Sequence, residues 1–317
     1  MISDKLFAQG YATDSILLKD NILRTLGYYH VFRHPLYIHE IHAFLQAEVS
    51  QTELQHTLDN MVREEHIFYA YNMYSLENSS RIFLKRLVGA DMAAEKMMEA
   101  RRCTALIASF PFVKAVCVSG SLSKGYADEN SDIDFFIITT RQRLWICRTL
   151  LHIFKKFTFI VNRQHSFCMN YFIDESRLCL EEKNLFTATE LATLVPVYNK
   201  QLHSRLLSEN EDWIKGYFPN MEMGNNHFQT IGTKSIVRKP AEWLLNILWP
   251  ERMNMVLMHL TDRLWRRKWK RKDYPMDDYE IAMKTKWYVS KQHPLNYQKK
   301  VLRLNNEETF RVAGLDL

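Results

Sequence analysis

Apolar residues recur at helical spacing in three stretches near the beginning of the chain. Residues 14–29 form the first stretch, residues 37–45 form the second, and the third begins after Ser50. Ser50 and Glu53 have the Ser-x-x-Glu spacing of a capping box, in which each side chain accepts a hydrogen bond from the backbone N–H of the other residue. We therefore expect three helices in this part of the chain.

A short aromatic-rich run follows these helices. Residues 67–76 predict a small β-hairpin that turns around Asn72. Three helices and a hairpin in this order resemble a winged helix, so we expect a winged-helix-like domain over residues 1–79. The resemblance implies DNA binding through the third helix, but that helix and its end carry four acidic residues against Arg63. Because a DNA reader needs cations for the phosphates, we favour a protein contact or a cover for an active site over nucleic-acid binding.

The next segment predicts a long helix and then two strands. Residues 80–110 carry apolar positions at helical spacing, and we expect Arg81 and Arg86 on the solvated face of this helix. Two apolar runs, residues 115–118 and 133–138, then predict two strands joined by a polar loop.

The second of these strands begins with two aspartates. Side chains alternate across a strand, so Asp132 and Asp134 point to one side while Ile133 and Phe135 point into the core. Two carboxylates on one side of a short apolar strand repel each other unless a divalent cation lies between them. We therefore expect a metal site at the beginning of this strand.

The turn after the first strand supplies the other half of a site. Gly120 permits close approach of the backbone, and the N–H groups that follow it, together with the hydroxyl of Ser121, favour a bound anion. A phosphate cradle beside paired aspartates is what metal-assisted phosphoryl or nucleotidyl transfer needs.

These residues resemble the signature of the DNA polymerase β-type nucleotidyltransferase superfamily. The spacing Gly-Ser-x-x-x-Gly-x-x-x-x-x-Ser-Asp-x-Asp is present without a gap over residues 120–134, with Gly125 and Ser131 at the intermediate positions. It is most similar to the minimal nucleotidyltransferases of prokaryotes, in which an arginine is frequent where this chain has Lys124. The resemblance implies an α+β fold: a small mixed sheet with flanking helices, preceded by the winged-helix-like domain and followed by a mostly helical C-terminal region.

The resemblance also implies a reaction. A nucleoside monophosphate would move from a nucleoside triphosphate, with ATP as the expected donor, to an acceptor hydroxyl with release of pyrophosphate. Asp132 and Asp134 would hold Mg²⁺ or Mn²⁺ and carry the catalysis. The nucleotide would contact five residues: Gly120, Ser121, Lys124, Gly125 and Ser131. The acceptor stays open between a small hydroxyl compound, a protein hydroxyl and a nucleic-acid end.

Members of this superfamily usually carry a third carboxylate on the next strand, which helps to hold the metal and accepts a proton. Residues 167–173 predict that strand here, and its centre is Asn170 instead of an acid. Asp174, on the same face, and Glu190, on a helix expected over residues 186–194, are the alternatives. Asn170 and Glu190 are therefore the additional metal ligands that we consider. The alternative function is a degenerate, non-catalytic domain that binds nucleotide, DNA or protein.

Charge and cysteine content narrow the choice of acceptor and of cellular compartment. The formal net charge is +6, and residues 263–272 alone hold seven cations, so the basic character is local and favours an anionic acceptor. Trp265 and Trp269 in this segment are four residues apart and are expected to face the core. Five cysteines without C-x-x-C spacing favour a reduced compartment and no zinc site.

The sequence predicts neither a signal peptide nor a membrane span. The N-terminus lacks a basic region followed by an apolar run, and the most apolar helix candidate, residues 144–161, is interrupted by basic residues. We expect a cytoplasmic protein without a membrane partner. We also expect three parts: the winged-helix-like domain, a catalytic domain over residues 80–195, and a helical region with a basic patch over residues 196–317.

Overall fold

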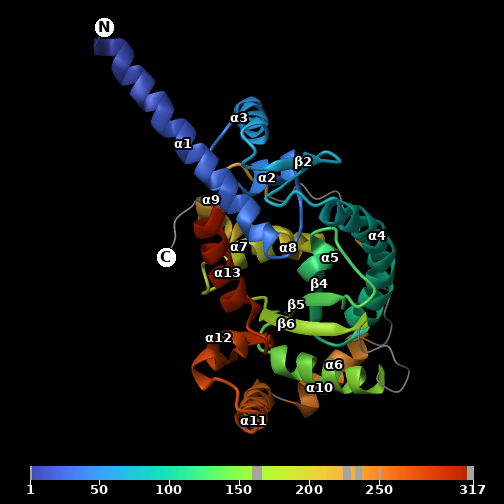
Figure 1. Cartoon of the computed structure of the whole chain (residues 1–317). Helices are drawn as coiled ribbons and strands as arrows, with labels where there is room; N and C mark the ends of the chain where they lie inside the picture. The colour runs from blue at the N-terminus through green and yellow to red at the C-terminus, as the bar shows by residue number, and fades with distance from the viewer. Residues whose placement is uncertain (1, 159–165, 224–229, 233–237, 250, 313–317) are drawn as a thin grey trace.

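The computed structural model describes the backbone of residues 2–158, 166–223, 230–232, 238–249 and 251–312. Figure 1 shows a central sheet with helices on both sides, and a smaller group of helices and strands at the N-terminal end of the molecule. The mixed sheet and its flanking helices confirm the α+β class.

The N-terminal part contains three helices and a small sheet. The helices are α1 (Ile2–His30), α2 (Ile38–Phe44) and α3 (Gln51–Arg63). The strands are β1 (Leu36–Tyr37), β2 (Phe68–Ala70) and β3 (Met73–Ser75), in the sheet order β1-β3-β2. The three helices and the hairpin follow the order expected from the sequence, whereas β1, between α1 and α2, was not expected. The assignment as a winged helix stays a prediction.

Local sequence signals explain where these elements begin and turn. The side chain of Ser50 accepts a hydrogen bond from the N–H of Glu53 at 3.2 Å, which satisfies one of the free N–H groups at the beginning of α3. Tyr71 and Asn72, between β2 and β3, both have positive φ angles, as a two-residue hairpin turn of type I′ requires. Leu54 and Leu58 on α3 pack into a core with α1 residues such as Ile22.

The central sheet has six strands in the order β7-β4-β5-β6-β9-β8. They are β4 (Val113–Ser119), β5 (Asp134–Thr139), β6 (Cys168–Asp174), β7 (Val195–Tyr198), β8 (Thr285–Lys286) and β9 (Val289–Lys291). β5 and β6 run parallel, and the other neighbouring pairs are antiparallel. The expected strand before the turn, the strand with the aspartates and the strand with Asn170 are thus adjacent.

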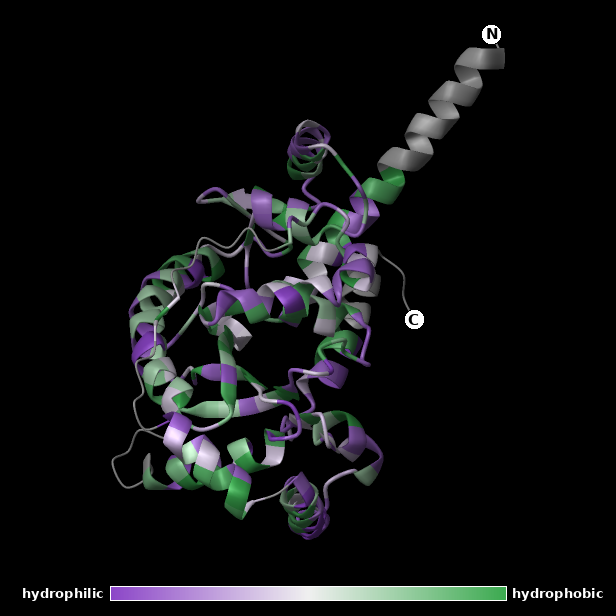
Figure 2. Ribbon diagram, turned by 180° about the vertical axis from the view of Figure 1, so that it is seen from behind, coloured by the Kyte–Doolittle hydropathy of each residue, from purple (hydrophilic) through white to green (hydrophobic). Residues whose placement is uncertain are grey.

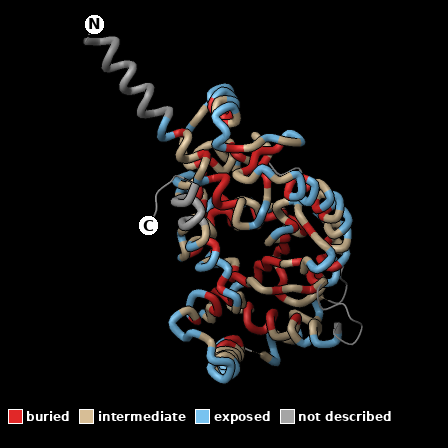
Figure 3. Tube along the Cα trace, in the orientation of Figure 1, coloured by how far each residue is buried: buried red, intermediate tan, exposed pale blue. Residues whose placement is uncertain are grey.

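Alternating side chains give this sheet two apolar faces. Val116, Val118 and Phe135 belong to a core that includes α4 (Ser80–Ser109) and α6 (Leu144–Thr158). Cys117 and Phe136 face the other side, against α7 (Leu185–Ala192), α8 (Lys200–Ser208) and α9 (Glu211–Tyr217). Figure 3 shows the buried residues concentrated along these layers.

The region after residue 196 is mostly helical, as expected, but it also completes the sheet. Its further helices are α10 (Arg238–Leu248), α11 (Glu251–Lys270), α12 (Tyr279–Ala282), α13 (Tyr297–Val312) and the short η2 (Met276–Asp278). β7 extends the sheet beside β4, and β9 pairs with β6, so the division proposed after residue 195 falls inside one sheet. Among the described helices, none is long and apolar enough to cross a membrane.

Candidate active site

The turn from β4 into the following loop lies directly beside the first residue of β5. Ser119 and Asp134 are register partners in the antiparallel pair of β4 and β5. Gly120 has φ +69°, and a Cβ atom placed on it would lie 2.6 Å from Oδ2 of Asp134. Only glycine therefore fits at this position, both because of its backbone conformation and because of the carboxylate beside it.

The single helical turn after Gly120 gives the predicted anion cradle its shape. The helix α5 spans only Gly120–Ser123, and Ser121 is exposed at its beginning. The hydroxyl of Ser123 donates to the carbonyl of Gly120 at 2.8 Å, so it holds the turn together from within. The exposed Ser121 hydroxyl is available to a ligand, and its role in nucleotide binding stays a prediction.

The loop between this turn and β5 is held by its own polar side chains. The hydroxyl of Ser131 donates to Asp128 and accepts from the N–H of Asp128, both at 2.8 Å, and this hydroxyl bond lowers the pKa of Asp128. The amine of Lys96 on α4 donates to the Ser131 carbonyl. Ser131 therefore shapes the loop that precedes Asp132.

Lys124 reaches back across the site. Its amine donates to the carbonyl of Gly120 at 3.1 Å and pairs with a carboxylate oxygen of Glu190 on α7 at 2.7 Å. Glu190 was considered from the sequence as a third metal-binding carboxylate. The structure places it at this turn, where it forms an ion pair with Lys124.

Asp134 occupies an environment that disfavours its charge. Its pKa is raised to about 6, mainly by burial and also by the negative charges of Glu190 and Asp132, while a hydrogen bond from Cys168 opposes the increase. Asp134 lies on the face of β5 that also carries Phe136, which packs against α7, and the orientation of Asp132 stays a prediction. A carboxylate with a perturbed pKa beside a glycine turn is a typical feature of a functional site.

Asn170 lies next to Asp134 because of an irregularity in β6. Phe135 pairs with Met169 but Phe136 pairs with Tyr171, so Asn170 is the extra residue of a β-bulge. Its amide nitrogen donates to Oδ1 of Asp134 at 3.1 Å. The strand thus places an amide, and not an acid, beside Asp134.

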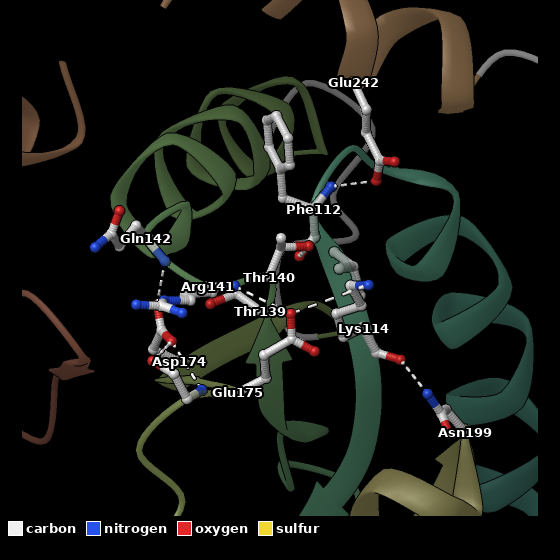
Figure 4. Close-up of polar contacts among 12 residues, drawn as sticks. Phe112, Lys114, Thr139, Thr140, Arg141, Gln142, Asp174, Glu175, Asn199 and Glu242 are labelled. Carbon is white, nitrogen blue, oxygen red and sulfur yellow. Dashed lines mark hydrogen bonds and ion pairs between the residues drawn. The ribbon is translucent and has the colours of Figure 1, made fainter. Parts of the chain in front are cut away.

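Asp174 lies at the opposite end of the sheet. It is the register partner of Thr139, five residues along β5 from Asp134, which corresponds to about 16 Å at the rise of a β-strand. Its carboxylate is fully buried and accepts from the N–H groups of Gln142 at 2.6 Å and Ser176 at 2.9 Å, as Figure 4 shows for Gln142. Asp174 orders the loop before α6 and is not a third carboxylate of the site.

The side chains at this turn are suitable ligands for a divalent cation, although they are few. Among the residues that the structure describes, no group of three or more histidine, cysteine, aspartate and glutamate side chains could hold a metal ion. Mg²⁺, however, is commonly held by one or two carboxylates together with substrate phosphates and water. Asp132 and Asp134 provide two carboxylates, and a cation would favour the ionised form of the latter, which burial disfavours. Their assignment as metal ligands stays a prediction, as does that of Asn170.

The sequence analysis missed one residue that supports the site. Arg86 was expected on the solvated face of its helix, but it is only 5% exposed. It donates to the carbonyl of Gly125 at 2.6 Å and to the carboxylate of Glu40 on α2 at 3.2 Å, so it joins the N-terminal part to the loop. The signal was its spacing, because Arg86 lies three and four residues from the apolar Phe83 and Ile82, on the buried stripe of α4.

Comparison with known families agrees with this geometry. Residues 104–186 match a family model described as a nucleotidyltransferase domain. A nucleotidyltransferase domain is present in this chain. The match runs from the end of α4 into α7 and so includes the turn, the loop and both aspartates. No curated protein and no solved structure matches the chain.

The nucleotidyltransferase domain is covered by segments outside the matched residues. His34, after α1, packs edge-on against Tyr126 with ring centroids 6.2 Å apart. At the other edge, the N–H of Gln292 donates to the carbonyl of Asn170 at 2.9 Å. The surroundings of the two aspartates are therefore built from the N-terminal, central and C-terminal parts of the chain.

Proposed function

We propose that this protein is a metal-dependent nucleotidyltransferase that moves a nucleoside monophosphate from a nucleoside triphosphate, with ATP as the first candidate, to an acceptor hydroxyl. The observation that carries this proposal is the close approach of Gly120 to Asp134, because it joins the anion-binding turn to the paired aspartates. The nucleotidyltransferase family match over the same residues supports it.

Each residue has a role that its position supports. Asp132 and Asp134 would hold Mg²⁺ or Mn²⁺, and a divalent cation there supplies charge stabilisation to the reacting phosphate and the leaving pyrophosphate. Gly120 and Ser121 would contact the triphosphate through backbone N–H groups and a hydroxyl. Lys124 would add a positive charge close to the same turn.

An amide at position 170, in place of an acid, is compatible with slow catalysis. Phosphoryl transfer depends mainly on positioning and on electrostatic stabilisation, and less on a general base. Glu190 is close enough for its charge to raise the pKa of Asp134, but its carboxylate is engaged by Lys124. We therefore assign the essential work to the two aspartates.

The test is a turnover assay with ATP labelled at the α-phosphate, in the presence of Mg²⁺ or Mn²⁺. Label transfer and pyrophosphate release should be followed separately with small hydroxyl compounds, with nucleic-acid ends and with the protein itself as acceptors. Asp132→Asn and Asp134→Asn should each reduce turnover by about a hundredfold or more, because each removes a charged ligand. Glu129→Gln is the matched control, since Glu129 is an exposed carboxylate in the same loop and should leave turnover unchanged.

Two results would contradict the proposal. Full turnover in Asp134→Asn would exclude the assigned role of this carboxylate. Binding of ATP without turnover for any acceptor class, measured by calorimetry with the wild-type chain, would favour a non-catalytic nucleotide-binding domain instead.

A further inference from the structure

Three helices at the end of the molecule opposite the N-terminal part present apolar side chains to solvent. These helices are α6, α10 and α11, which lie together in Figures 1 and 2. We give the name apolar–basic face to the exposed apolar side chains of these three helices together with the cations beside them. Its large apolar side chains are Ile153, Phe157, Trp243, Leu244, Ile247, Leu248, Val256, Leu260 and Leu264.

The exposed residues of this face follow helical spacing. Val256, Leu260 and Leu264 are four residues apart and form one stripe along α11, with exposed fractions of 51–57%. Trp243 and Ile247 form a similar pair on α10, with exposed fractions of 67% and 58%. Contiguous apolar stripes of this kind mark interaction surfaces more often than scattered exposed residues do.

The opposite sides of the same helices are anchored, so the stripes cannot simply turn inward. On α11, the buried Asn254 accepts hydrogen bonds from the N–H groups of Trp145 at 2.8 Å and Ile146 at 3.3 Å, at the beginning of α6. On α10, Glu242 accepts from the N–H of Phe112 at 2.8 Å, as Figure 4 shows. These contacts fix which side of each helix faces outward.

The tryptophans of the basic segment belong to the anchored side as well. Trp265 and Trp269 pack against a small core that contains Tyr279 and Met283, as the sequence predicted. They are therefore not a stacking platform for nucleobases.

Cations flank the apolar stripes. α11 and the two residues after it carry eight arginines and lysines against two acids, and one of these acids, Asp262, is paired with Arg266. The exposed cations on and beside the face are Lys156, Lys239, Arg252, Arg263, Arg267, Lys270 and Arg271. An apolar stripe flanked by cations is complementary to a surface that is both apolar and negatively charged.

We propose that the apolar–basic face binds the surface of an anionic lipid bilayer, with α10 and α11 lying in the plane of the headgroups. Aliphatic and tryptophan side chains would enter the boundary with the acyl chains, and the cations would contact acidic headgroups, as in amphipathic interfacial helices. A nucleic acid would account for the cations but not for the apolar stripes, and a second copy of the face would place cations against cations. The expectation of no membrane partner rested on the lack of a spanning helix, which surface binding does not need.

The test is flotation of the full-length protein with vesicles. Vesicles of phosphatidylcholine with about one third phosphatidylserine should bind the protein, and vesicles of phosphatidylcholine alone should bind at least about tenfold less. Ile247→Ser combined with Leu260→Ser should reduce binding by about tenfold or more. Val88→Ser combined with Leu106→Ser is the matched control, because these α4 residues are equally exposed, at 59% and 51% against 58% and 51%.

A charge variant and a spectroscopic measurement complete the test. Arg263→Gln combined with Arg267→Gln should weaken binding to the acidic vesicles, whereas Arg81→Gln combined with Arg102→Gln, which are exposed elsewhere on the chain, should not. Trp243 is exposed, so tryptophan emission should shift to shorter wavelength on binding, and Trp243→Phe should reduce this shift.

Three outcomes would overturn the proposal. Equal vesicle binding by the aliphatic variant and its control would show that the apolar stripes do not contact lipid. A second result is self-association of the protein in sedimentation experiments without binding to vesicles. If Ile247→Ser with Leu260→Ser then abolishes the self-association, the face is a contact between copies of the chain. A third result is salt-sensitive binding of an oligonucleotide without binding to vesicles. If the arginine changes abolish this binding and the aliphatic changes do not, the face is a nucleic-acid surface.

Discussion

Asp134 is expected to lower the stability of the metal-free protein, so replacing it with asparagine should raise that stability. Burial raises the pKa of Asp134 from 3.8 to about 6. The folded protein therefore holds this proton more tightly than the unfolded chain does. As the pH rises from below 4 to above 6, the folded state loses that advantage and its stability decreases.

The size of the effect follows from the pKa difference. A difference of about two units corresponds to about 3 kcal/mol of unfolding free energy, and partial contact with solvent reduces this to about 1–3 kcal/mol. An asparagine at this position can still accept the hydrogen bond from Asn170, so the main change is the loss of a poorly solvated charge. Asp134→Asn should therefore be more stable than wild type by about 1–3 kcal/mol at pH 8, and about equal to it below pH 4.

The assay is equilibrium unfolding by urea between pH 4 and pH 8, with a chelator present throughout. Glu129→Gln serves as the control for removing a carboxylate from the same loop, and its stability should follow wild type at every pH. Adding Mg²⁺ should stabilise wild type more than Asp134→Asn, because the ligand binds only the folded state. If Asp134→Asn is equal to or less stable than wild type at pH 8 without metal, the reasoning about this buried charge is wrong.

Three further changes test the supports of the site by urea unfolding. Gly120→Ala should lower the free energy of unfolding by about 2–4 kcal/mol, because it combines a left-handed backbone with a contact of 2.6 Å to Asp134. Gly125→Ala, whose added Cβ would have its nearest neighbour at 3.8 Å, should lower it by only about 1–2 kcal/mol. Equal losses of stability in the two variants would refute the role of the contact with Asp134. Arg86→Met should cost about 3–5 kcal/mol, since it removes the cation that pairs with Glu40 on α2 and leaves the carbonyl of Gly125 without this donor, and a loss below about 1 kcal/mol would contradict this. Asp174→Ala should cost about 2–4 kcal/mol through two N–H groups left unpaired, with the nucleotide affinity of the remaining folded protein unchanged.

Much of the fold near the site could be predicted from the sequence because local signals and chemistry agree there. The capping residue Ser50, the alternation from Ile133 onward and the turn at Gly120 each act over a few residues. The bulge at Asn170 was not visible in the sequence, although it brings the amide of Asn170 next to Asp134.

The errors arose where long-range contacts override local patterns. The sequence around Arg86 is typical of a surface cation. Its burial depends on a loop carbonyl and a carboxylate on α2 that are distant in the sequence. Asp174 and Asn170 lie on one strand, but the parallel pairing with β5 carries Asp174 to the far end of the sheet. The short strand β7, which includes Pro196, has too few residues for a recognisable period and is a strand only because β4 pairs with it.

The position of β9 beside β6 has a consequence for biosynthesis. Tyr171 pairs with Lys291, about 120 residues later in the chain, so β6 has an open edge until the ribosome has made the C-terminal hairpin. During that interval the exposed edge of β6 is a target for pairing with other nascent chains. A fragment that stops after residue 195 would keep this edge permanently, and we expect it to aggregate although it contains every residue from Gly120 to Asp134.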